Sequence, residues 1–199
     1  MNIRRINLEG SPEIKTGYML PFSYRPISIH QGYNGPYSHF AYRRESHLGG
    51  VVYDYRFFID FIVPPGTPVK PAKEGVVQLV LDNYSDFYEG SDILQGLLVK
   101  TNFIVIRHED GTNTLYSHLA QKSSRVRPNE RVQQDQVIAL TGLSGWIGPV
   151  PHPHFGAIYS QNKTMTLSQE QKFRFADMKE VGNALTIAAC KWLTIETEI

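Results

Sequence analysis

The sequence predicts a mainly β protein, a small antiparallel β-sandwich/barrel hybrid with one peripheral C-terminal helix. Three observations support this class. Short runs rich in Val, Ile, Phe and Tyr recur through the middle of the chain, clusters of Gly, Pro, Asn and Asp separate them, and no helical pattern lies between them. The runs are residues 56–63, 75–81, 102–107, 114–119, 137–141 and 154–159.

The connections and the C-terminal region complete this prediction. Residues 109–113 (EDGTN) join two of the runs, and their Asp-Gly pair is typical of a hairpin turn. Apolar side chains at helical spacing predict one amphipathic helix near the C-terminus, with Met178, Val181, Leu185, Ala188 and Trp192 on its apolar face. We therefore expect an N-terminal extended segment (1–30) packed on the core, a central domain (31–160) and a C-terminal extension (161–199).

The composition excludes several classes of function. A chain of 199 residues suits one domain with peripheral additions. Lys and Arg number 20 against 19 Asp and Glu, so the net charge of +1 gives no electrostatic footprint for nucleic acid or an anionic membrane. No apolar run is long enough for a transmembrane segment, and the N-terminus lacks the apolar stretch of a signal peptide. Nothing in the sequence indicates an oligomeric state.

His152-Pro153-His154 is the most informative tripeptide. Side chains two residues apart in a strand point to the same side, so both imidazoles would project from one face as metal ligands do. Pro153 has no amide hydrogen, which places this stretch at an edge or a rim. Two surface histidines in a Pro-rich loop are the alternative. Because Cys190 is the only cysteine, any metal must be held by His and carboxylate side chains.

Asp60 interrupts the apolar run from Phe57 to Val63, so its strand is expected to bury the carboxylate. Burying an unpaired charge is costly, and the nearest neighbours of Asp60 on the same face of this strand, Phe58 and Ile62, carry no charge. The pattern therefore favours metal ligation over a salt bridge from a distant Arg. His118 lies in another β run, where a lone histidine is usually a satisfied core residue. Its selection as a functional residue depends on the other three candidates, Asp60, His152 and His154.

In their order along the chain, these residues resemble the lysostaphin-type zinc metallopeptidases, which cleave peptidoglycan peptides. The resemblance covers roughly residues 18–160. Its principal blocks are Asp60-Phe61 with Pro65-Gly66-Thr67-Pro68-Val69, then Tyr116-Ser117-His118-Leu119, and last Pro151-His152-Pro153-His154-Phe155.

The resemblance implies one Zn2+ ion held by a His, an Asp and the second His of the HxH pair, which makes Asp60 and His154 ligands. It implies catalytic roles for His118 and His152 beside the metal. The chemistry agrees, because three protein ligands leave a fourth position for water, whose proton two unliganded imidazoles can take.

The third ligand departs from the commonest pattern, HxxxD. The position four residues before the Asp holds Arg56, and a guanidinium stays protonated and cannot bind zinc. His39, in the stretch QGYNGPYSH, resembles a branch of the family whose first His lies further upstream, and we prefer it. His47 lacks that context and is the alternative. We expect Tyr37, in the same stretch, and Tyr116 to contact the substrate.

The resemblance implies a zinc endopeptidase that hydrolyses peptidoglycan stem or cross-bridge peptides by metal-activated water, in the cell envelope or outside the cell. The alternative is a non-catalytic relative in which Arg56 impairs the metal site and the groove binds peptidoglycan or a partner protein. A third hypothesis, an intracellular metal-dependent hydrolase of another substrate, follows only from the missing signal peptide.

Overall fold

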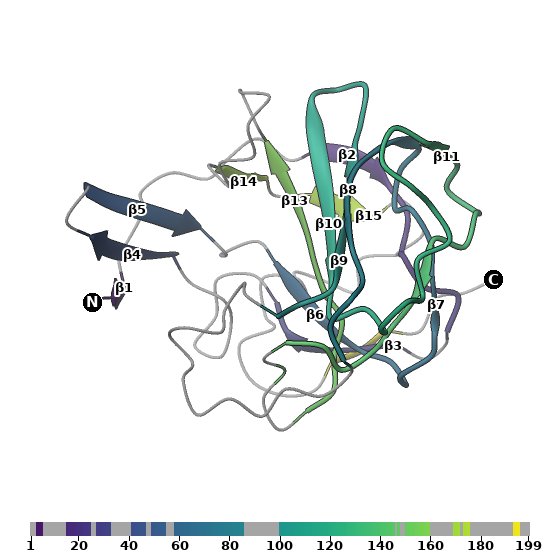
Figure 1. Ribbon diagram of the computed structural model, residues 1–199, viewed down its shortest axis with the longest axis horizontal. Helices are drawn as coiled ribbons and strands as arrows, with labels where there is room; N and C mark the ends of the chain where they lie inside the picture. The colour runs from purple at the N-terminus through teal and green to yellow at the C-terminus, as the bar shows by residue number, and fades with distance from the viewer. Residues whose placement is uncertain are drawn as a thin grey trace.

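The computed structural model is built from short β-strands, and the residues that it describes contain no helix (Figure 1). It describes residues 3–5, 15–24, 27–32, 41–46, 49–54, 58–85, 100–145, 147, 150–159, 169–171, 173–175 and 193–195. Nearly all strand pairs are antiparallel, which confirms the predicted mainly antiparallel β class.

One large twisted sheet positions the rest of the molecule. Its strands, in spatial order, are β11 (Arg131–Val132), β8 (Gly75–Leu81), β9 (Phe103–Arg107), β10 (Thr112–Ser117), β13 (His154–Tyr159), β6 (Ile59–Ile62), β3 (Ile27–Gln31) and β16 (Leu193–Ile195). A short strand, β14 (Gln169–Gln171), pairs with β13 outside this path. The strands β8, β9 and β13 correspond closely to runs predicted from the sequence.

Three smaller sheets surround the large one. The strands β1 (Ile3–Arg5), β4 (Ala41–Ser46) and β5 (Gly49–Asp54) form one, which lies to one side of the molecule (Figure 1). The pair β7 (Pro68–Val69) and β12 (Ala139–Leu140) forms the second, and β2 (Lys15–Tyr18) with the parallel β15 (Phe173–Phe175) forms the third.

The two faces of the large sheet carry different side chains, because successive residues of a strand point to opposite sides. One face bears the main core, which includes Ile27, Ile29, Ile59, Phe61, Ile104, Ile106, Tyr116, Phe155 and Ala157. Along β6 and β13, the residues that alternate with this core are Asp60 and His154, which are paired across the two strands. A second apolar cluster of Phe58, Val105 and Leu115, with Phe103 against it, is separate from the main core.

The predicted hairpin at residues 109–113 is present between β9 and β10. The amide of His108 bonds to the carbonyl of Thr112 at 2.8 Å, and Gly111 has a φ of 81°. That backbone conformation is one that glycine adopts without a steric penalty, so the Asp-Gly pair supplies the turn as expected.

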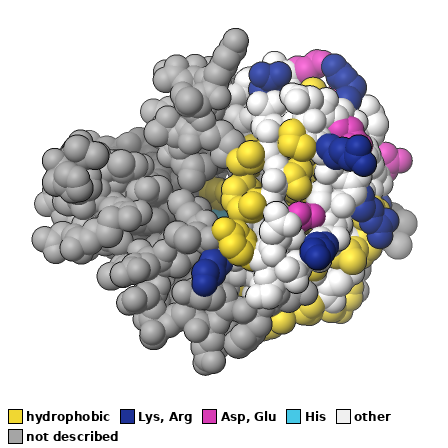
Figure 2. Space-filling model, in the orientation of Figure 1, with side chains coloured by type: hydrophobic (Ala, Val, Ile, Leu, Met, Phe, Trp, Pro, Cys, Tyr) yellow, Lys and Arg dark blue, Asp and Glu magenta, His cyan; other side chains and the backbone are white. Residues whose placement is uncertain are grey.

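On the face drawn in Figure 2, hydrophobic side chains gather beside the part drawn in grey, and basic and acidic side chains are interspersed around them. Among the residues described, no helix has the length and apolar character needed to cross a bilayer.

The predicted C-terminal helix and the predicted strand over residues 114–119 have different outcomes. The residues of the predicted C-terminal helix, from Met178 to Trp192, lie outside the described residues. The described parts beyond residue 160 are the strands β14, β15 and β16. The prediction that residues 114–119 form one strand through His118 is wrong, because β10 ends at Ser117 and His118 has a φ of 60°. A left-handed residue cannot continue a strand, so the chain turns at that point.

Candidate active site

Three elements of the fold bring a carboxylate and three histidines together. Asp60 lies on β6 and is the cross-strand partner of His154, the first residue of β13. His152 comes two residues earlier, and His118 directly follows β10, the other neighbour of β13. The cluster therefore forms where β10 ends and β13 begins.

Asp60 is the centre of this cluster. Its side chain is 1% exposed, and its Oδ1 lies 2.8 Å from Nδ1 of His154. Its Oδ2 lies 3.4 Å from Nε2 of His152. The predicted burial of this carboxylate is thus present, and both of its oxygens face imidazole nitrogens. A buried carboxylate needs hydrogen-bond donors or a cation to remain ionised, and Nδ1–H of His154 is one such donor.

His118 is held in a fixed tautomer. Its Nδ1 lies 2.7 Å from the carbonyl oxygen of Ser144, and a carbonyl can only accept, so Nδ1 carries the hydrogen. Burial, followed by the neighbouring imidazoles of His152 and His154, lowers the pKa of His118 to about 3. The ring is therefore neutral near pH 7, and Nε2 has a lone pair that can accept a proton.

His152 is anchored in the same way as His118. Its Nδ1 donates to the carbonyl oxygen of Val150 at 2.7 Å, which leaves Nε2 on the side of Asp60. The ring centroids of His118 and His152 are 5.1 Å apart, and those of His118 and His154 are 6.1 Å apart. His154 differs from the other two, because it presents Nδ1 rather than Nε2 to the carboxylate.

A buried polar network holds the loop that anchors His118. The Ser144 hydroxyl donates to the carbonyl of Leu119 at 2.7 Å and accepts from the amide of Asn102 at 3.0 Å. The amide of Gly142 donates to the carbonyl of His118 at 2.8 Å. Ser144 and Asn102 are both fully buried. A non-glycine residue with positive φ persists only where its surroundings fix it, and this network does so for His118.

The side-chain atoms that meet between Asp60 and His154 are of the two types that zinc accepts, carboxylate oxygen and imidazole nitrogen. Within the described ranges, no set of three or more His, Cys, Asp or Glu side chains is arranged to hold a metal ion. The predicted third ligand, His39 or His47, lies outside the described residues, as do Arg56 and Tyr37.

Tyr116 occupies a different environment from the one expected of a substrate-binding residue. It is 2% exposed, belongs to the main core and packs against Phe155 at a centroid distance of 5.2 Å. Its hydroxyl accepts a hydrogen bond from the amide of Ala72 at 2.7 Å. This position argues against contact with a substrate and gives the hydroxyl a structural role.

Sequence reasoning missed three features of the site. His30, on β3, lies with its ring centroid 5.9 Å from that of His152, at a point where the register between β3 and β6 shifts. Phe58 stacks on His154 at 4.2 Å, and Ser144 anchors His118. The alternation of Ile27 and Ile29 in β3 is the only local signal, and it places His30 off the core face without indicating what it faces.

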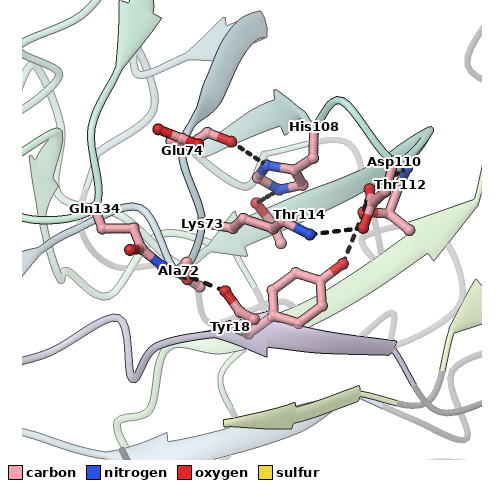
Figure 3. A network of polar contacts seen from close by, with 10 residues as sticks. Tyr18, Ala72, Lys73, Glu74, His108, Asp110, Thr112, Thr114 and Gln134 are labelled. Atoms are coloured by element: carbon pink, nitrogen blue, oxygen red, sulfur yellow. Dashed lines mark hydrogen bonds and ion pairs between the residues drawn. The ribbon is translucent and has the colours of Figure 1, made fainter. Parts of the chain in front are cut away.

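His108 is also buried, but it lies away from this cluster, in the polar network of Figure 3. Nδ1 of His108 donates to the carbonyl of Glu74 at 2.7 Å, and Nε2 lies 2.9 Å from the Thr114 hydroxyl. Nearby, Lys73 and Thr112 hydrogen-bond to Asp110. The expectation that His108 is structural agrees with this environment.

Residues 58–166, more than half of the chain, match the sequence profile described as Peptidase family M23. The peptidoglycan DD-endopeptidase ShyC of Vibrio cholerae is 32% identical over 115 residues, which is 56% of this chain and 23% of that protein. The DD-carboxypeptidase/endopeptidase Mpg of Neisseria meningitidis is 29% identical over 136 residues, 64% of this chain and 27% of that protein. The chain thus spans about a quarter of the length of these curated relatives.

Two solved structures are similar to parts of this chain. A mutant catalytic domain of the prophage-encoded M23 protein EnpA from Enterococcus faecalis superimposes with a TM-score of 0.47 and 21% identity. The superposition covers 75% of this chain and 91% of that one. A zinc-containing peptidase from Vibrio cholerae gives a TM-score of 0.45 and 25% identity over 73% of this chain and 37% of that one.

Proposed function

Because the chain belongs to peptidase family M23, we propose that it is a zinc-dependent endopeptidase that hydrolyses peptide bonds in peptidoglycan. The observation that carries the proposal is the buried carboxylate of Asp60, whose two oxygens face Nδ1 of His154 and Nε2 of His152. A structural ion pair would need only one partner for this carboxylate. A metal site with adjacent proton-transfer groups accounts for all of these side chains together.

Asp60 and His154 are the proposed ligands in the described residues. Their facing atoms are carboxylate oxygen and imidazole nitrogen, both of which zinc accepts once Nδ1 of His154 has lost its proton. His39 is the proposed third ligand, with His47 as the alternative. A zinc ion bound there supplies a Lewis acid that polarises the peptide carbonyl and lowers the pKa of a water molecule.

His118 and His152 are the proposed catalytic residues. In both rings Nδ1–H donates a hydrogen bond to a backbone carbonyl, so Nε2 is the nitrogen that remains for proton transfer. Because its hydrogen is held on Nδ1 by the Ser144 carbonyl, His118 presents the lone pair of Nε2 to the cluster, and Nε2 is the proposed general base that would take a proton from the attacking water. Nε2 of His152 lies 3.4 Å from Oδ2 of Asp60, and since Nδ1 already carries a hydrogen, Nε2 donates only when the ring is an imidazolium. In that form His152 is proposed to stabilise the oxyanion of the tetrahedral intermediate.

The substrate class is proposed from the relatives. ShyC is described as a peptidoglycan DD-endopeptidase and Mpg as a DD-carboxypeptidase/endopeptidase. By analogy, the substrate is a peptidoglycan stem or cross-bridge peptide, and the site of action is the cell envelope or the exterior of the cell. Isolated peptidoglycan is therefore the substrate with which to test the chain.

Zinc content and peptidoglycan cleavage test the proposal together. We expect roughly one zinc ion per wild-type chain, and release of new amino groups from isolated peptidoglycan. His39→Ala should lose the metal while His47→Ala keeps it; the reverse result would exchange their roles. His108→Leu is the control, because His108 lies in a separate network and its loss should leave zinc bound.

One outcome would favour the alternative function. A wild-type protein that carries no zinc, cleaves nothing and still sediments with peptidoglycan would be a binding relative in which Arg56 has replaced a ligand. That result would overturn the proposed enzyme and leave the family assignment intact.

A further inference from the structure

Phe58 covers one face of the His154 ring. The two rings are nearly parallel, with centroids 4.2 Å apart and planes inclined by 18°. Phe58 is 1% exposed and packs with Val105 and Leu115 in the second apolar cluster. The proposed zinc ligand therefore lies against a buried aromatic side chain that is held by other residues.

Gly156 fixes where the Phe58 ring lies. The register of β6 and β13 pairs Asp60 with His154 and Ile59 with Phe155, so Phe58 comes opposite Gly156. A Cβ atom at Gly156 would lie 2.7 Å from three atoms of the Phe58 ring. An aromatic ring that covers a cross-strand glycine is a recognised packing arrangement in antiparallel sheets. The ring thus fills the space that the missing side chain leaves.

This packing restricts how His154 can turn. The χ2 angle of histidine has two broad, roughly opposite preferences, and a half-turn between them moves Nδ1 to the other side of the ring. During such a turn the imidazole would swing out of its plane, and the stacked Phe58 ring occupies that space. Only one of the two orientations places Nδ1 toward Oδ1 of Asp60, at the observed 2.8 Å.

We propose that Phe58 is a positioning residue of the metal site, which holds the His154 ring with Nδ1 toward Asp60 and so strengthens zinc binding. This inference rests on the proposed function, since it assumes that His154 is a ligand. Side chains that orient metal ligands commonly change metal affinity by about 10- to 100-fold when they are lost. Here hydrocarbon packing would do part of what a hydrogen bond usually does.

The zinc dissociation constant of Phe58→Met tests this role. Methionine is apolar and flexible and fills much of the same space, but it has no flat ring. We expect zinc to bind about 10-fold more weakly. Phe22→Met is the matched control, because Phe22 is also buried, at 2% exposure, but belongs to the main core and stacks edge-on with Phe61.

The control separates positioning from general loss of packing. Both variants should lose thermal stability, whereas only Phe58→Met should lose zinc affinity. Unchanged zinc affinity in Phe58→Met would overturn the proposal, and so would an equal loss of affinity in Phe22→Met. A wild-type protein that binds no zinc would instead contradict the proposed function.

A measurement on the metal-free protein tests the positioning role without zinc. In long-range 1H–15N spectra, wild-type His154 should show a single tautomer with the hydrogen on Nδ1, which donates to Asp60. Phe58→Met should show averaged signals of two ring orientations, and an unchanged spectrum would count against the role. If Phe58→Met does not fold, Gly156→Ala replaces it, because the added methyl must displace the Phe58 ring and should disturb the His154 signals in the same way.

Discussion

Two buried histidines lie near opposite ends of strand β10 and share three properties: burial, a contact from Nδ1 to a backbone carbonyl, and a lowered pKa. His108 precedes the strand and His118 follows it, with exposed fractions of 3% and 8%. Each lies with Nδ1 2.7 Å from a backbone carbonyl, that of Glu74 or that of Ser144. Burial lowers the pKa of both imidazoles.

The difference lies in the second ring nitrogen. Nε2 of His108 contacts the Thr114 hydroxyl at 2.9 Å, so both of its nitrogens are used within the fold. No second hydrogen bond joins the His118 ring to another residue in the part of the chain that the structure describes, and its ring faces His152 and His154 instead. Burial and a lowered pKa thus do not distinguish the two histidines, and the proposed catalytic role of His118 rests on its Nε2, which lies beside other polar groups.

The largest expected effect is on catalysis, from His118→Ala. Removal of a general base typically lowers kcat by about 10²- to 10⁴-fold. The fold and the zinc content should persist, because the proposed ligands are Asp60, His154 and His39 and not this side chain. Rates of peptidoglycan cleavage, measured beside zinc content and a melting curve, check this expectation. Full activity in the variant would remove His118 from the proposed mechanism.

His108→Leu should have the opposite effect to His118→Ala, because it should lower stability and leave activity unchanged. The variant leaves the Glu74 carbonyl and the Thr114 hydroxyl without their imidazole partner, at a cost of about 1–3 kcal/mol in the free energy of unfolding. Cleavage per folded molecule should stay near the wild-type rate. A urea titration and an activity assay on the same sample separate the effects on stability and on activity. A loss of activity without a loss of stability would show that His108, like His118, takes part in cleavage.

The same variant should change how stability depends on pH. Burial lowers the pKa of His108 below its unfolded value of 6.5, so the unfolded chain binds the proton more readily. The wild-type protein should therefore lose stability as the pH falls below about 6.5, and His108→Leu should lose less of it over that range.

Tyr116→Phe tests whether Tyr116, which lies near the His118 end of β10, contacts the substrate. The hydroxyl accepts from the Ala72 amide at 2.7 Å inside the core, so its loss should cost about 1–2 kcal/mol of stability. KM for a peptidoglycan peptide should be unchanged. A KM raised several-fold, with stability unaffected, would restore the substrate contact that the sequence predicted.

The sequence was sufficient where the relevant property is local. Runs of apolar residues predicted the strands, and an Asp inside one of them predicted the buried carboxylate, because both depend on neighbours along the chain. The positive φ of His118 could not be predicted, because even residue types that are enriched at positive φ, histidine among them, adopt it in a small fraction of cases. The stacking of Phe58 on His154 requires the register of two strands, which alternation alone leaves open.

The smallest expected effect concerns Asp110, the carboxylate of the network that contains His108. Partial burial would raise the pKa of Asp110, but hydrogen bonds from Lys73 and Thr112 outweigh it and lower the pKa to about 2, against 3.8 in the unfolded chain. The stabilisation is therefore complete above about pH 4 and is lost as the pH falls toward 2.

Asp110→Asn should abolish that acid-sensitive part of the stability. Its size should be below about 1 kcal/mol, because the Lys73–Asp110 pair is partly exposed and solvent screens it. Melting temperatures measured between pH 2 and pH 6 should fall more steeply in the wild type than in the variant. Because Asp110 and His108 belong to a network separate from the His118 cluster, the cleavage rate near pH 7 should be the same in both proteins, and a lowered rate would show that the two ends of β10 are coupled.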